Sequence, residues 1–467
     1  MRNIYLYDSS KKEKVLFEAQ EDGKVVIYVC GPTVYDDAHL GHARSAIVFD
    51  LLHRIFKQNG FEVTMAKNYT DVDDKIIKKI KETGKSLDEI TSHYIASYKN
   101  EMNKLNILDN TIEPHATQNI EAMVEMINKL LKKDSAYLLD DGVYLDTSKD
   151  TSYGNLSHRA SDENSQARVE SNNNKRDQKD FALWKFFSKD EIGFDAPYGY
   201  GRPGWHIECS AMIDKHLANH NLPYAIDIHA GGADLLFPHH ENEACQTRCS
   251  TDQELAKYWI HNGFVNINGQ KMSKSLGNSF FLKDALTQYS GEVIRFYMMS
   301  THYRADLSFN EEDLLSSKKR LDKLYRLKKR IFPSGLGKTN KDIEKNIFEA
   351  LNDDMNTSKA LASIDEYIST VNDKLDANPK DKGLKKEVSA TFEFIGNIMG
   401  IGSNNPYEYF QFGISEEEKN KIETLIQQRA DAKKEKNFEL SDQIRDQLTA
   451  MGISTMDTPN GTLWEKD

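Results

Sequence analysis

The sequence has few cysteines and no long apolar run, and these two shortages exclude several classes of protein. Four cysteines among 467 residues are too few for a disulfide framework, so reduced thiols that serve as metal ligands are expected. No stretch approaches the roughly 20 apolar residues that a membrane span needs, and the N-terminus lacks the apolar core of a signal peptide. With 39% hydrophobic and 29% charged residues, the chain is predicted to be a soluble, cytoplasmic globular protein without a membrane partner.

The chain also lacks an excess of positive charge. Its formal net charge is −12, so composition alone does not indicate a nucleic-acid-binding protein, although phosphate contacts need only local basic patches. The candidate patch is the segment 318–330, in which Leu321, Leu324 and Leu327 recur every third residue. An amphipathic helix with a solvated basic face and a helix that contacts RNA both remain possible interpretations.

An alternation of strand and helix patterns opens the chain. A short β-branched run at 24–30 predicts a buried parallel strand, and it is followed by patterns of a helix at 42–59, a strand at 61–69 and a helix at 71–82. This order predicts a right-handed parallel crossover in an α/β Rossmann-like nucleotide-binding domain. Ligands bind at the carboxyl ends of such strands, so one crevice is expected to hold Cys30, His39, His42 and Thr70.

Two short motifs suggest that the ligand carries phosphate. His39, Gly41 and His42 stand at the expected N-terminus of the helix, where backbone N–H groups and the helix dipole favour anions. Far downstream, the sequence KMSKS at 271–275 lies between glycines and offers Lys271 and Lys274 to phosphates. A loop with ordinary histidines and a solvated surface turn are the alternatives for each motif taken alone. Both motifs in this order resemble the two signatures of class I aminoacyl-tRNA synthetases.

Four further residues stand out as possible metal ligands: Cys30, Cys209, His239 and Glu243. His239 and Glu243 are four positions apart and share one face of a helix. Cys245 and Cys249 have the same spacing but fall on a different face, so we interpret them as core thiols. His240 is interpreted as a polar group beside the metal ligands.

A closer family resemblance rests on four segments in combination. They are YVCGPTVYDDAHLGHARS, GWHIECSAM, FPHHENE and KMSKSLGN, and together they resemble cysteinyl-tRNA synthetases. The resemblance covers nearly the whole chain, because RADAKKEKNFELSDQIRDQL followed by GTLW is similar to the C-terminal anticodon region of that family. It implies a ligase that activates L-cysteine with ATP, releases pyrophosphate, and transfers cysteine from cysteinyl-adenylate to the 3′ end of tRNA(Cys).

The resemblance assigns roles to the ligand candidates. It implies that Cys30, Cys209, His239 and Glu243 bind one zinc ion per chain, to which the substrate thiol is also coordinated. A thiol ionises near neutral pH and is a soft ligand, whereas a serine hydroxyl is neither, so the metal selects cysteine over serine. A separate editing domain is then not needed, and the insertion is too short for one. Thr70, Trp205 and His229 are expected to line the cysteine pocket, with a core aromatic as the alternative role of Trp205.

The nucleotide residues follow from the same resemblance. His39 and His42 are expected to bind phosphate oxygens, and Lys271 and Lys274 to neutralise the leaving pyrophosphate, with magnesium bound to ATP. Further ATP contacts are expected from a glycine-rich turn after a strand and from the KMSKS segment: Gly41, Gly231, Gly232, Asp234 and Ser273.

The tail departs from the usual family pattern. Arg429, Asp442 and Asp457 match family positions implicated in reading the anticodon. Lys433 stands where arginine is common, and Phe438 where tryptophan is common. Lysine lacks the bidentate fork of arginine, and phenylalanine stacks on a base without an indole donor. Because of these two replacements, the sequence does not define the individual anticodon contacts. It still predicts that the domain binds the anticodon.

The domain organisation is predicted from the patterns together with the resemblance. We expect the first half of the catalytic domain at 1–118, a connective insertion at 119–204, the second half at 205–265, a stem-contact region with KMSKS at 266–310, an α-helical bundle at 311–402, and a linker with a small mixed α/β anticodon-binding domain at 403–467. A monomer is expected.

Two other functions remain possible. A cysteine ligase that forms the same adenylate and passes cysteine to an amino sugar would keep the catalytic core and the zinc. Such a ligase is not expected to carry an anticodon-like tail. A non-catalytic RNA-binding or zinc-storage relative is disfavoured by the intact histidines and lysines of both nucleotide motifs.

Overall fold

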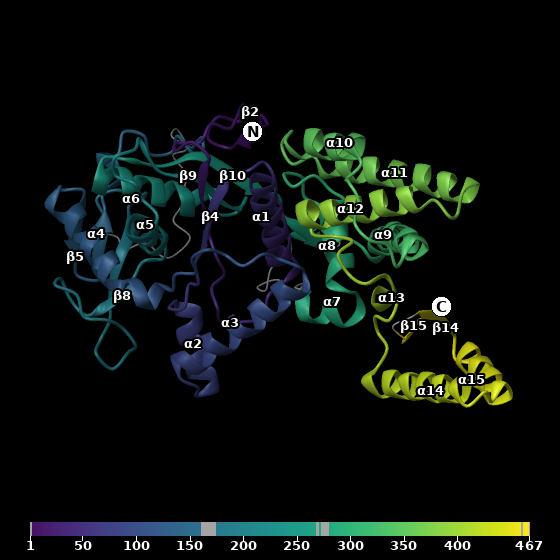
Figure 1. The fold of residues 1–467 in the computed structure, drawn as a ribbon. Helices are drawn as coiled ribbons and strands as arrows, with labels where there is room; N and C mark the ends of the chain where they lie inside the picture. The colour runs from purple at the N-terminus through teal and green to yellow at the C-terminus, as the bar shows by residue number, and fades with distance from the viewer. Residues whose placement is uncertain (1, 160–173, 268–269, 272–279, 459–460, 467) are drawn as a thin grey trace. The chain divides into compact units, whose positions relative to one another are not determined.

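The computed structural model describes residues 2–159, 174–267, 270–271, 280–458 and 461–466 (Figure 1). The chain forms two compact units. The first comprises Met1–Lys283, Met298–Asn310 and Phe348–Lys359, and the second comprises Asp284–Tyr297, Glu311–Ile347 and Ala360–Asp467. Among the described helices, none is both long and apolar enough to cross a membrane.

A four-stranded parallel sheet forms the centre of the first unit. Its strands are β3 (Lys24–Val29), β4 (Glu62–Lys67), β9 (Tyr224–Gly232) and β10 (Glu254–Asn262), in the order β10-β9-β3-β4. Helix α1 (Leu40–Gln58) connects β3 to β4, as the sequence predicts. Because β3 has β4 on one side and β9 on the other, the strand order reverses at its carboxyl end, which is where such sheets bind ligands.

The two faces of the sheet carry different layers. Tyr28 and Ala66 pack in one buried cluster with Cys209, Ile213 and Ala244, which lie on α5 (Trp205–His216) and α6 (Glu241–Thr251). Side chains alternate along a strand, so the neighbouring positions of β3 and β4 face the layer formed by α1. Residues with chemical roles at the ends of β3 and β4 are therefore divided between two separate faces.

Proline is common at the start of a helix, so the sequence predicts a helix from Pro238, but the regular helix begins later. Leu236–His240 form a π-helical turn in which Phe237 has extended backbone angles, and the regular helix α6 begins at Glu241. Cys209 lies inside α5 rather than at its start, and Gly231 and Gly232 are the last residues of β9 rather than a turn after it. These shifts move element boundaries without changing the order of elements.

The chain between β4 and α5 contains helices and a second sheet. The helices are α2 (Asp74–Thr83), α3 (Leu87–Lys104), η1 (Ala116–Asn119), α4 (Ile120–Lys132) and η2 (Thr147–Lys149). The antiparallel strands are β5 (Ala136–Leu139), β6 (Gly142–Leu145), β7 (Phe181–Phe186) and β8 (Gly201–Pro203). Strands β5 and β6 pair as a hairpin, and the apolar segment at 181–186 forms strand β7, in which Trp184 is fully buried.

Short elements complete the first unit. At the N-terminus, β1 (Tyr5–Asp8) and β2 (Glu13–Leu16) pair as a hairpin. A small sheet contains β11 (Val265–Ile267), β12 (Gln270–Lys271) and β13 (Leu307–Phe309). Helices α7 (Leu282–Gln288) and α8 (Gly291–Met299) lie between β12 and β13 in the chain, and most of both helices belongs to the second unit.

Helices dominate the rest of the chain, as predicted. They are α9 (Glu311–Ile331), α10 (Lys341–Leu351), α11 (Thr357–Ala377) and α12 (Lys382–Met399). Leu321, Leu324 and Leu327 of α9 are buried, so the amphipathic character of the basic segment is confirmed. The segment 400–413, predicted to be a linker, contains a short helix, α13 (Pro406–Tyr409).

The C-terminal tail contains two helices and a hairpin. These are α14 (Glu416–Lys434), α15 (Phe438–Ala450), β14 (Ile453–Thr458) and β15 (Gly461–Lys466). Its core includes Ile422 and Leu448 from the two helices and Trp464 from the last strand. The two helices and the hairpin agree with the mixed α/β content predicted for this part of the chain.

Candidate metal and nucleotide site

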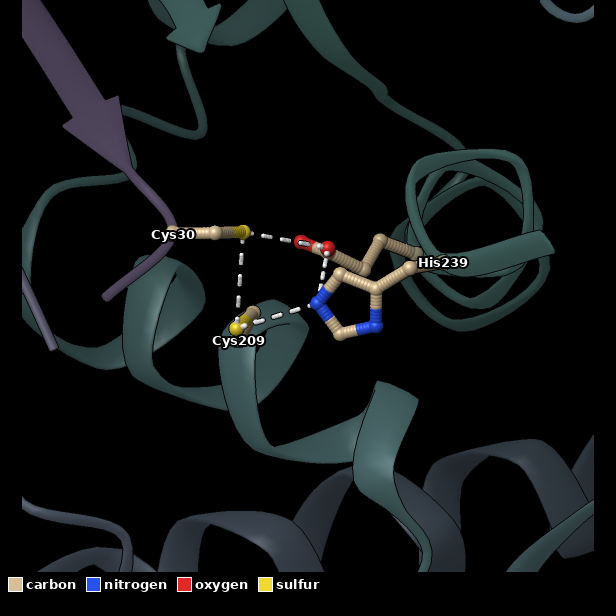
Figure 2. Close-up of side chains that lie close together, drawn as sticks. Cys30, Cys209 and His239 are labelled. Atoms are coloured by element: carbon tan, nitrogen blue, oxygen red, sulfur yellow. Dashed lines mark hydrogen bonds and ion pairs between the residues drawn. The ribbon is translucent and has the colours of Figure 1, made fainter. Parts of the chain in front are cut away.

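The four predicted metal ligands meet at the carboxyl edge of the parallel sheet. Cys30 follows β3, Cys209 projects from α5, His239 lies in the π-helical turn, and Glu243 lies on α6. Their ligand atoms are all within 4.8 Å of one another (Figure 2). The Sγ atom of Cys30 is 3.9 Å from that of Cys209 and 3.6 Å from Glu243 Oε1, and His239 Nε2 is 2.9 Å from Glu243 Oε1.

Burial and neighbouring charges set the protonation of this cluster. Desolvation, together with the hydrogen bond to Cys209, raises the pKa of the Cys30 thiol well above its ordinary value. That same hydrogen bond lowers the pKa of Cys209 to about 6. Burial opposes ionisation of Glu243, but His229 and His239 outweigh it and lower the pKa of Glu243 to about 2. At neutral pH the cluster therefore offers a thiolate and a carboxylate, which are ionised ligands of the kind that a metal ion requires.

A second imidazole orients His239. Its Nε2 faces Cys209 and Glu243, while its Nδ1 lies 2.9 Å from Nδ1 of His206 on α5. Burial lowers the pKa of His206 well below its ordinary value, so a neutral His206 shares one proton with His239. A partner on the second nitrogen fixes which nitrogen of a ligating histidine faces the metal. His206 was missed at the sequence level, although it stands three positions before Cys209 on the same helix.

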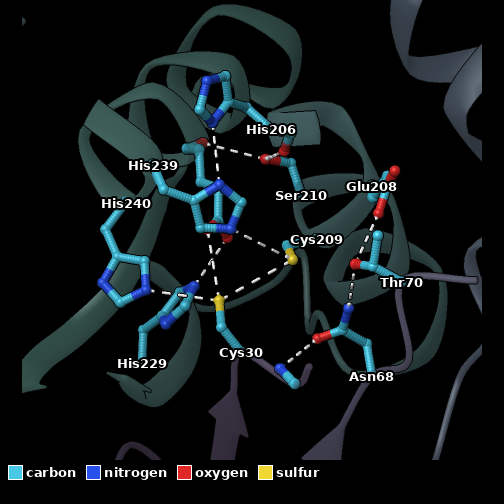
Figure 3. A network of polar contacts seen from close by, with 12 residues as sticks. Cys30, Asn68, Thr70, His206, Glu208, Cys209, Ser210, His229, His239 and His240 are labelled. Carbon is cyan, nitrogen blue, oxygen red and sulfur yellow. Dashed lines mark hydrogen bonds and ion pairs between the residues drawn. The ribbon is translucent and has the colours of Figure 1, made fainter. Parts of the chain in front are cut away.

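The structure also brings two other histidines to Cys30 and Glu243. His229 Nε2 is 2.8 Å from Glu243 Oε2, and His240 Nε2 is 3.4 Å from Cys30 Sγ (Figure 3). With Cys30 and Glu243 they form a second group whose ligand atoms are close enough to hold a metal ion. His240 Nδ1 in turn contacts His261 of β10 at 2.8 Å. His261 carries no sequence signal, because only the pairing of β9 with β10 brings it here.

The residues predicted to line a cysteine pocket surround the same cluster. The ring of Trp205 stacks on that of His239, with centroids 4.1 Å apart, so Trp205 is part of the cluster's wall. The Thr70 hydroxyl donates to Glu208 Oε2 at 3.0 Å, and burial raises the pKa of Glu208 well above its ordinary value. Asn68, which was not predicted, accepts a 2.8 Å hydrogen bond from the N–H of Gly31.

Gly31 is needed where β3 ends. A Cβ atom at this position would lie 1.6 Å from the carbonyl oxygen of Asn68, which no side chain could tolerate. The backbone that follows β3 is thus held against the backbone that follows β4. This contact places Cys30 and Thr70 at the same edge, as the sequence analysis expects.

The histidine motif forms the N-terminus of α1. Nδ1 of the N-cap residue His39 accepts from the N–H of Gly41 at 3.0 Å, and Nδ1 of His42 accepts from the N–H of His39 at 3.2 Å. The two rings stack, with centroids 3.8 Å apart. A Cβ atom at Gly41 would lie 2.8 Å from the His39 ring, so glycine allows the stacked arrangement. The motif therefore folds as a compact cap that presents imidazoles at a helix N-terminus.

The structure covers only some of the other residues predicted to bind ATP. Gly231 and Gly232 end β9, and the Asp234 carboxylate lies close to Gly232, where a Cβ atom would be 2.6 Å from Asp234 Oδ1. The backbone of Lys271 belongs to β12. Ser273 and Lys274 lie outside the described residues, so their roles stay predictions.

The tail residues divide into two groups. Arg429 Nη1 is 2.8 Å from Asp457 Oδ1, Lys433 also pairs with Asp457, and these contacts lower the pKa of the Asp457 carboxyl well below its usual range. Phe438, in contrast, is 65% exposed. Asp442 pairs with Arg445 at 3.0 Å, and both side chains are exposed.

Similarity to known proteins defines the class. Residues 16–319 match the tRNA synthetases class I (C) catalytic domain, and residues 347–403 match the DALR domain. The fold is similar to that of Mycobacterium tuberculosis methionyl-tRNA synthetase in complex with methionyl-adenylate, with a TM-score of 0.60, 14% identity, and coverage of 81% of this chain and 92% of that chain. A putative arginyl-tRNA synthetase from Campylobacter jejuni gives a TM-score of 0.55 at 14% identity, with 83% and 95% coverage. The chain has the fold of a class I aminoacyl-tRNA synthetase.

Relatives of higher identity define the family within this class. A cysteine--tRNA ligase of Aliarcobacter butzleri is 66% identical over 466 residues and covers 100% of both chains. A cysteine--tRNA ligase of a Nitratiruptor species is 60% identical over 465 residues, covering 99% of this chain and 100% of the relative. The chain belongs to the cysteine--tRNA ligase family, and it is an enzyme of the ligase class.

Proposed function

We propose that the chain activates L-cysteine with ATP, forming cysteinyl-adenylate and pyrophosphate, and then transfers cysteine to the 3′ end of tRNA(Cys). The observation that carries this proposal is the cluster of two thiols, an imidazole and a carboxylate at the carboxyl edge of the sheet. The N-terminus of α1, with its two imidazoles, follows β3 in the same part of the chain. A metal bound by sulfur ligands suits the thiol of the substrate, and an anion site at a helix N-terminus suits the phosphates of the nucleotide.

The donor set fits zinc. Two sulfur ligands, one imidazole and one carboxylate belong to the groups that bind zinc in proteins, and Cys30, Cys209, His239 and Glu243 are the proposed ligands. When bound, zinc would coordinate the thiol of cysteine and so discriminate against serine, whose hydroxyl is harder to ionise. His206 would hold His239 with Nε2 toward the metal. The pocket for the amino acid would be lined by Trp205, Thr70 and His229.

Charge stabilisation would come from residues around the triphosphate. His39, Gly41 and His42 would bind phosphate oxygens at the N-terminus of α1, where the helix dipole adds to their effect. Gly231, Gly232 and Asp234 would contact the adenosine. Lys271, Ser273 and Lys274 would bind the pyrophosphate that leaves, together with magnesium. Positioning of the two substrates would account for most of the remaining acceleration.

For tRNA binding, the five tail residues predicted to contact the anticodon divide into two groups. The pairing of Asp457 with Arg429 and Lys433 suits a structural role, in which these side chains join α14 to β14. Phe438 and Asp442 are exposed on α15 and remain available to a nucleotide base. Aromatic stacking tolerates the replacement of tryptophan by phenylalanine. A monomeric state and a cytoplasmic location stay predictions from the sequence.

Two assays on one preparation test the proposal. Cysteine-dependent exchange of pyrophosphate into ATP measures activation, and attachment of labelled cysteine to tRNA(Cys) measures transfer. We expect both reactions. Exchange with transfer to an amino sugar but not to tRNA would favour the rival cysteine ligase, and the absence of exchange would favour a non-catalytic relative.

A further inference from the structure

A cavity of about 290 Å³ lies on the opposite face of the sheet from the metal cluster. It is lined by residues of α1, β4, α3 and the segment 107–113 that follows α3, all within the first unit. Lys67 and Tyr69 face this cavity, whereas the alternate positions Asn68 and Thr70 face the cysteine site. The cavity is therefore separate from the proposed catalytic site, and nothing in the proposed reaction uses it.

The cavity contains one buried cation. The side chain of Lys67 is only 9% exposed, and its Nζ donates to the hydroxyl of Tyr98, a neutral group. Among the described residues, no carboxylate lies within ion-pair distance of Lys67. Burying a charge is costly unless an opposite charge accompanies it. An ammonium group has three N–H donors, so this one can still bind an anion.

Two of the three acids that line the cavity, Asp50 and Glu113, are neutralised by other partners, and the third, Asp109, is exposed to solvent. Asp50 accepts a 2.7 Å hydrogen bond from Arg54 Nε and another of 2.7 Å from the N–H of Leu108. Glu113 pairs with Lys99 at 2.5 Å and accepts from Asn110 at 2.9 Å. The charge that remains available to a ligand is thus the positive charge of Lys67.

Most of the remaining wall is apolar. It includes side chains from the strands, α1 and α3: Val29, Ala46, Phe49, Met65 and Met102. The exposed side chains of Lys99, Asn103 and Asp109 also belong to the lining, so the cavity meets solvent there. Its volume is about twice that of a ~150 Å³ apolar cavity that binds benzene. A ligand of about eight to twelve non-hydrogen atoms therefore suits it.

We propose that this cavity binds a small monocarboxylate with an apolar body, with its carboxylate held by Lys67 and Tyr98. The Tyr98 hydroxyl accepts from Lys67, so its own proton can be donated to a second carboxylate oxygen. One ammonium and one hydroxyl match a singly charged carboxylate better than a phosphate dianion, which would need more positive charge. The apolar walls accept the hydrocarbon part. This binding site adds to the proposed function and does not depend on it.

Fluorine NMR on the full-length, zinc-loaded protein tests the proposal. The probe is 4-fluorobenzoate, its neutral match is 4-fluorobenzamide, and phenylacetate and 4-methylpentanoate serve as competitors. We expect saturable binding of the carboxylate with a dissociation constant of about 1 mM or tighter, and binding of the amide at least about tenfold weaker. Saturating ATP and cysteine should leave the carboxylate bound, because the cysteine site is on the other face of the sheet and the proposed phosphate contacts at the N-terminus of α1 do not line the cavity.

Three variants locate the site. Lys67→Met should weaken binding by at least about tenfold, Tyr98→Phe should weaken it about threefold or more, and the cavity-filling Ala46→Leu should abolish it while keeping the lysine. Lys104→Met, at an exposed lysine of the same helix as Tyr98, is the matched control and should bind normally. Melting temperature and zinc content report whether each variant folds. Absence of binding by all three carboxylates, equal binding by Lys67→Met, or displacement by ATP and cysteine would overturn the proposal.

Discussion

Cys30 and Cys209 are separated by 179 positions in the chain, yet their Sγ atoms lie 3.9 Å apart. The carboxyl end of β3 carries the first residue and α5 carries the second, on either side of the insertion. Both are free thiols, and the hydrogen bond between them favours the thiolate of Cys209. The fold itself thus brings two sulfur atoms together, and His239 and Glu243 complete a group of side chains that could hold a soft metal ion.

Removing the partner of His239 should weaken the metal site without removing a ligand. In His206→Ala, the imidazole of His239 loses the contact at its Nδ1, and such losses typically reduce metal affinity about 10- to 100-fold. Competition with a chelator of known zinc affinity measures the change. His216→Ala, at an exposed histidine of the same helix, should retain the original affinity. Equal affinities of the two variants would show that His206 does not position the ligand.

The N-terminus of α1 should be needed for activation but not for metal binding. His39→Asn keeps a residue that caps helices well but removes an imidazole that would stabilise charge on phosphate. Pyrophosphate exchange should slow by at least about a hundredfold, the range found when one transition-state hydrogen-bond donor is lost. Lys274→Ala should slow exchange similarly. Both variants should keep their zinc, and exchange at the original rate in either would refute the role assigned to that residue.

The Arg429–Asp457 pair should stabilise the tail in a pH-dependent way. The pKa of Asp457 is lowered mainly by its hydrogen bonds to Arg429 and Lys433, so the folded tail favours the ionised carboxylate. This stabilisation is present above the ordinary carboxyl pKa and is lost as the pH falls below it. Because Asp457 is 48% exposed, solvent screening limits the contribution to about 1 kcal/mol.

Arg429→Ala measures that contribution. Its melting temperature should fall at pH 7, and the difference from the original protein should shrink at pH 3, because the carboxyl of the unfolded chain is then largely protonated while the folded tail still holds it ionised. Arg445→Ala, at an exposed arginine of α15, is the control and should melt normally. A deficit that stays the same at both pH values would show that packing rather than charge explains the effect.

Phe438 should contribute to tRNA binding alone. The exposed ring can stack on a base, and such stacking is worth about 1–3 kcal/mol. Phe438→Ala should therefore raise the KM for tRNA(Cys) about 5- to 100-fold and leave pyrophosphate exchange unchanged. Phe412→Ala, at another exposed phenylalanine of the tail, should leave both reactions unaffected. An unchanged KM in Phe438→Ala would remove this residue from the interface.

The sequence predicts those parts of the site that depend on local periodicity. Residues four apart share a helical face, so His239 and Glu243 can be paired from their spacing alone, and the end of a β-branched run locates Cys30. Only the family resemblance indicated that Cys209 belongs to the same set of metal ligands. The arrangement of the parallel sheet followed from the order of strand and helix patterns.

Contacts that arise only in the folded chain could not be predicted in this way. His261 reaches His240 because β10 lies beside β9, and no spacing within the sequence encodes that register. Arg429 and Lys433 match positions expected to contact tRNA, yet both contact Asp457 on a strand that was not predicted. In the sequence, Lys67 is simply a polar residue within a predicted strand. Its burial against Tyr98 results from the packing of α3 and could not be predicted.

The central claim is that the metal cluster makes the enzyme specific for cysteine. The most direct measurement is the charging of tRNA(Cys) with labelled cysteine and with labelled serine, before chelation, after chelation, and after zinc is restored. Cysteine charging should disappear with the metal and return with zinc, and serine should not be charged by the zinc-loaded enzyme.

One pair of variants completes this measurement. Cys209→Ser should lose zinc and cysteine selectivity together, whereas Cys249→Ser, at a buried core thiol of α6, should retain both. Undiminished cysteine charging by the chelated enzyme, or full zinc occupancy with unchanged selectivity in Cys209→Ser, would contradict the account.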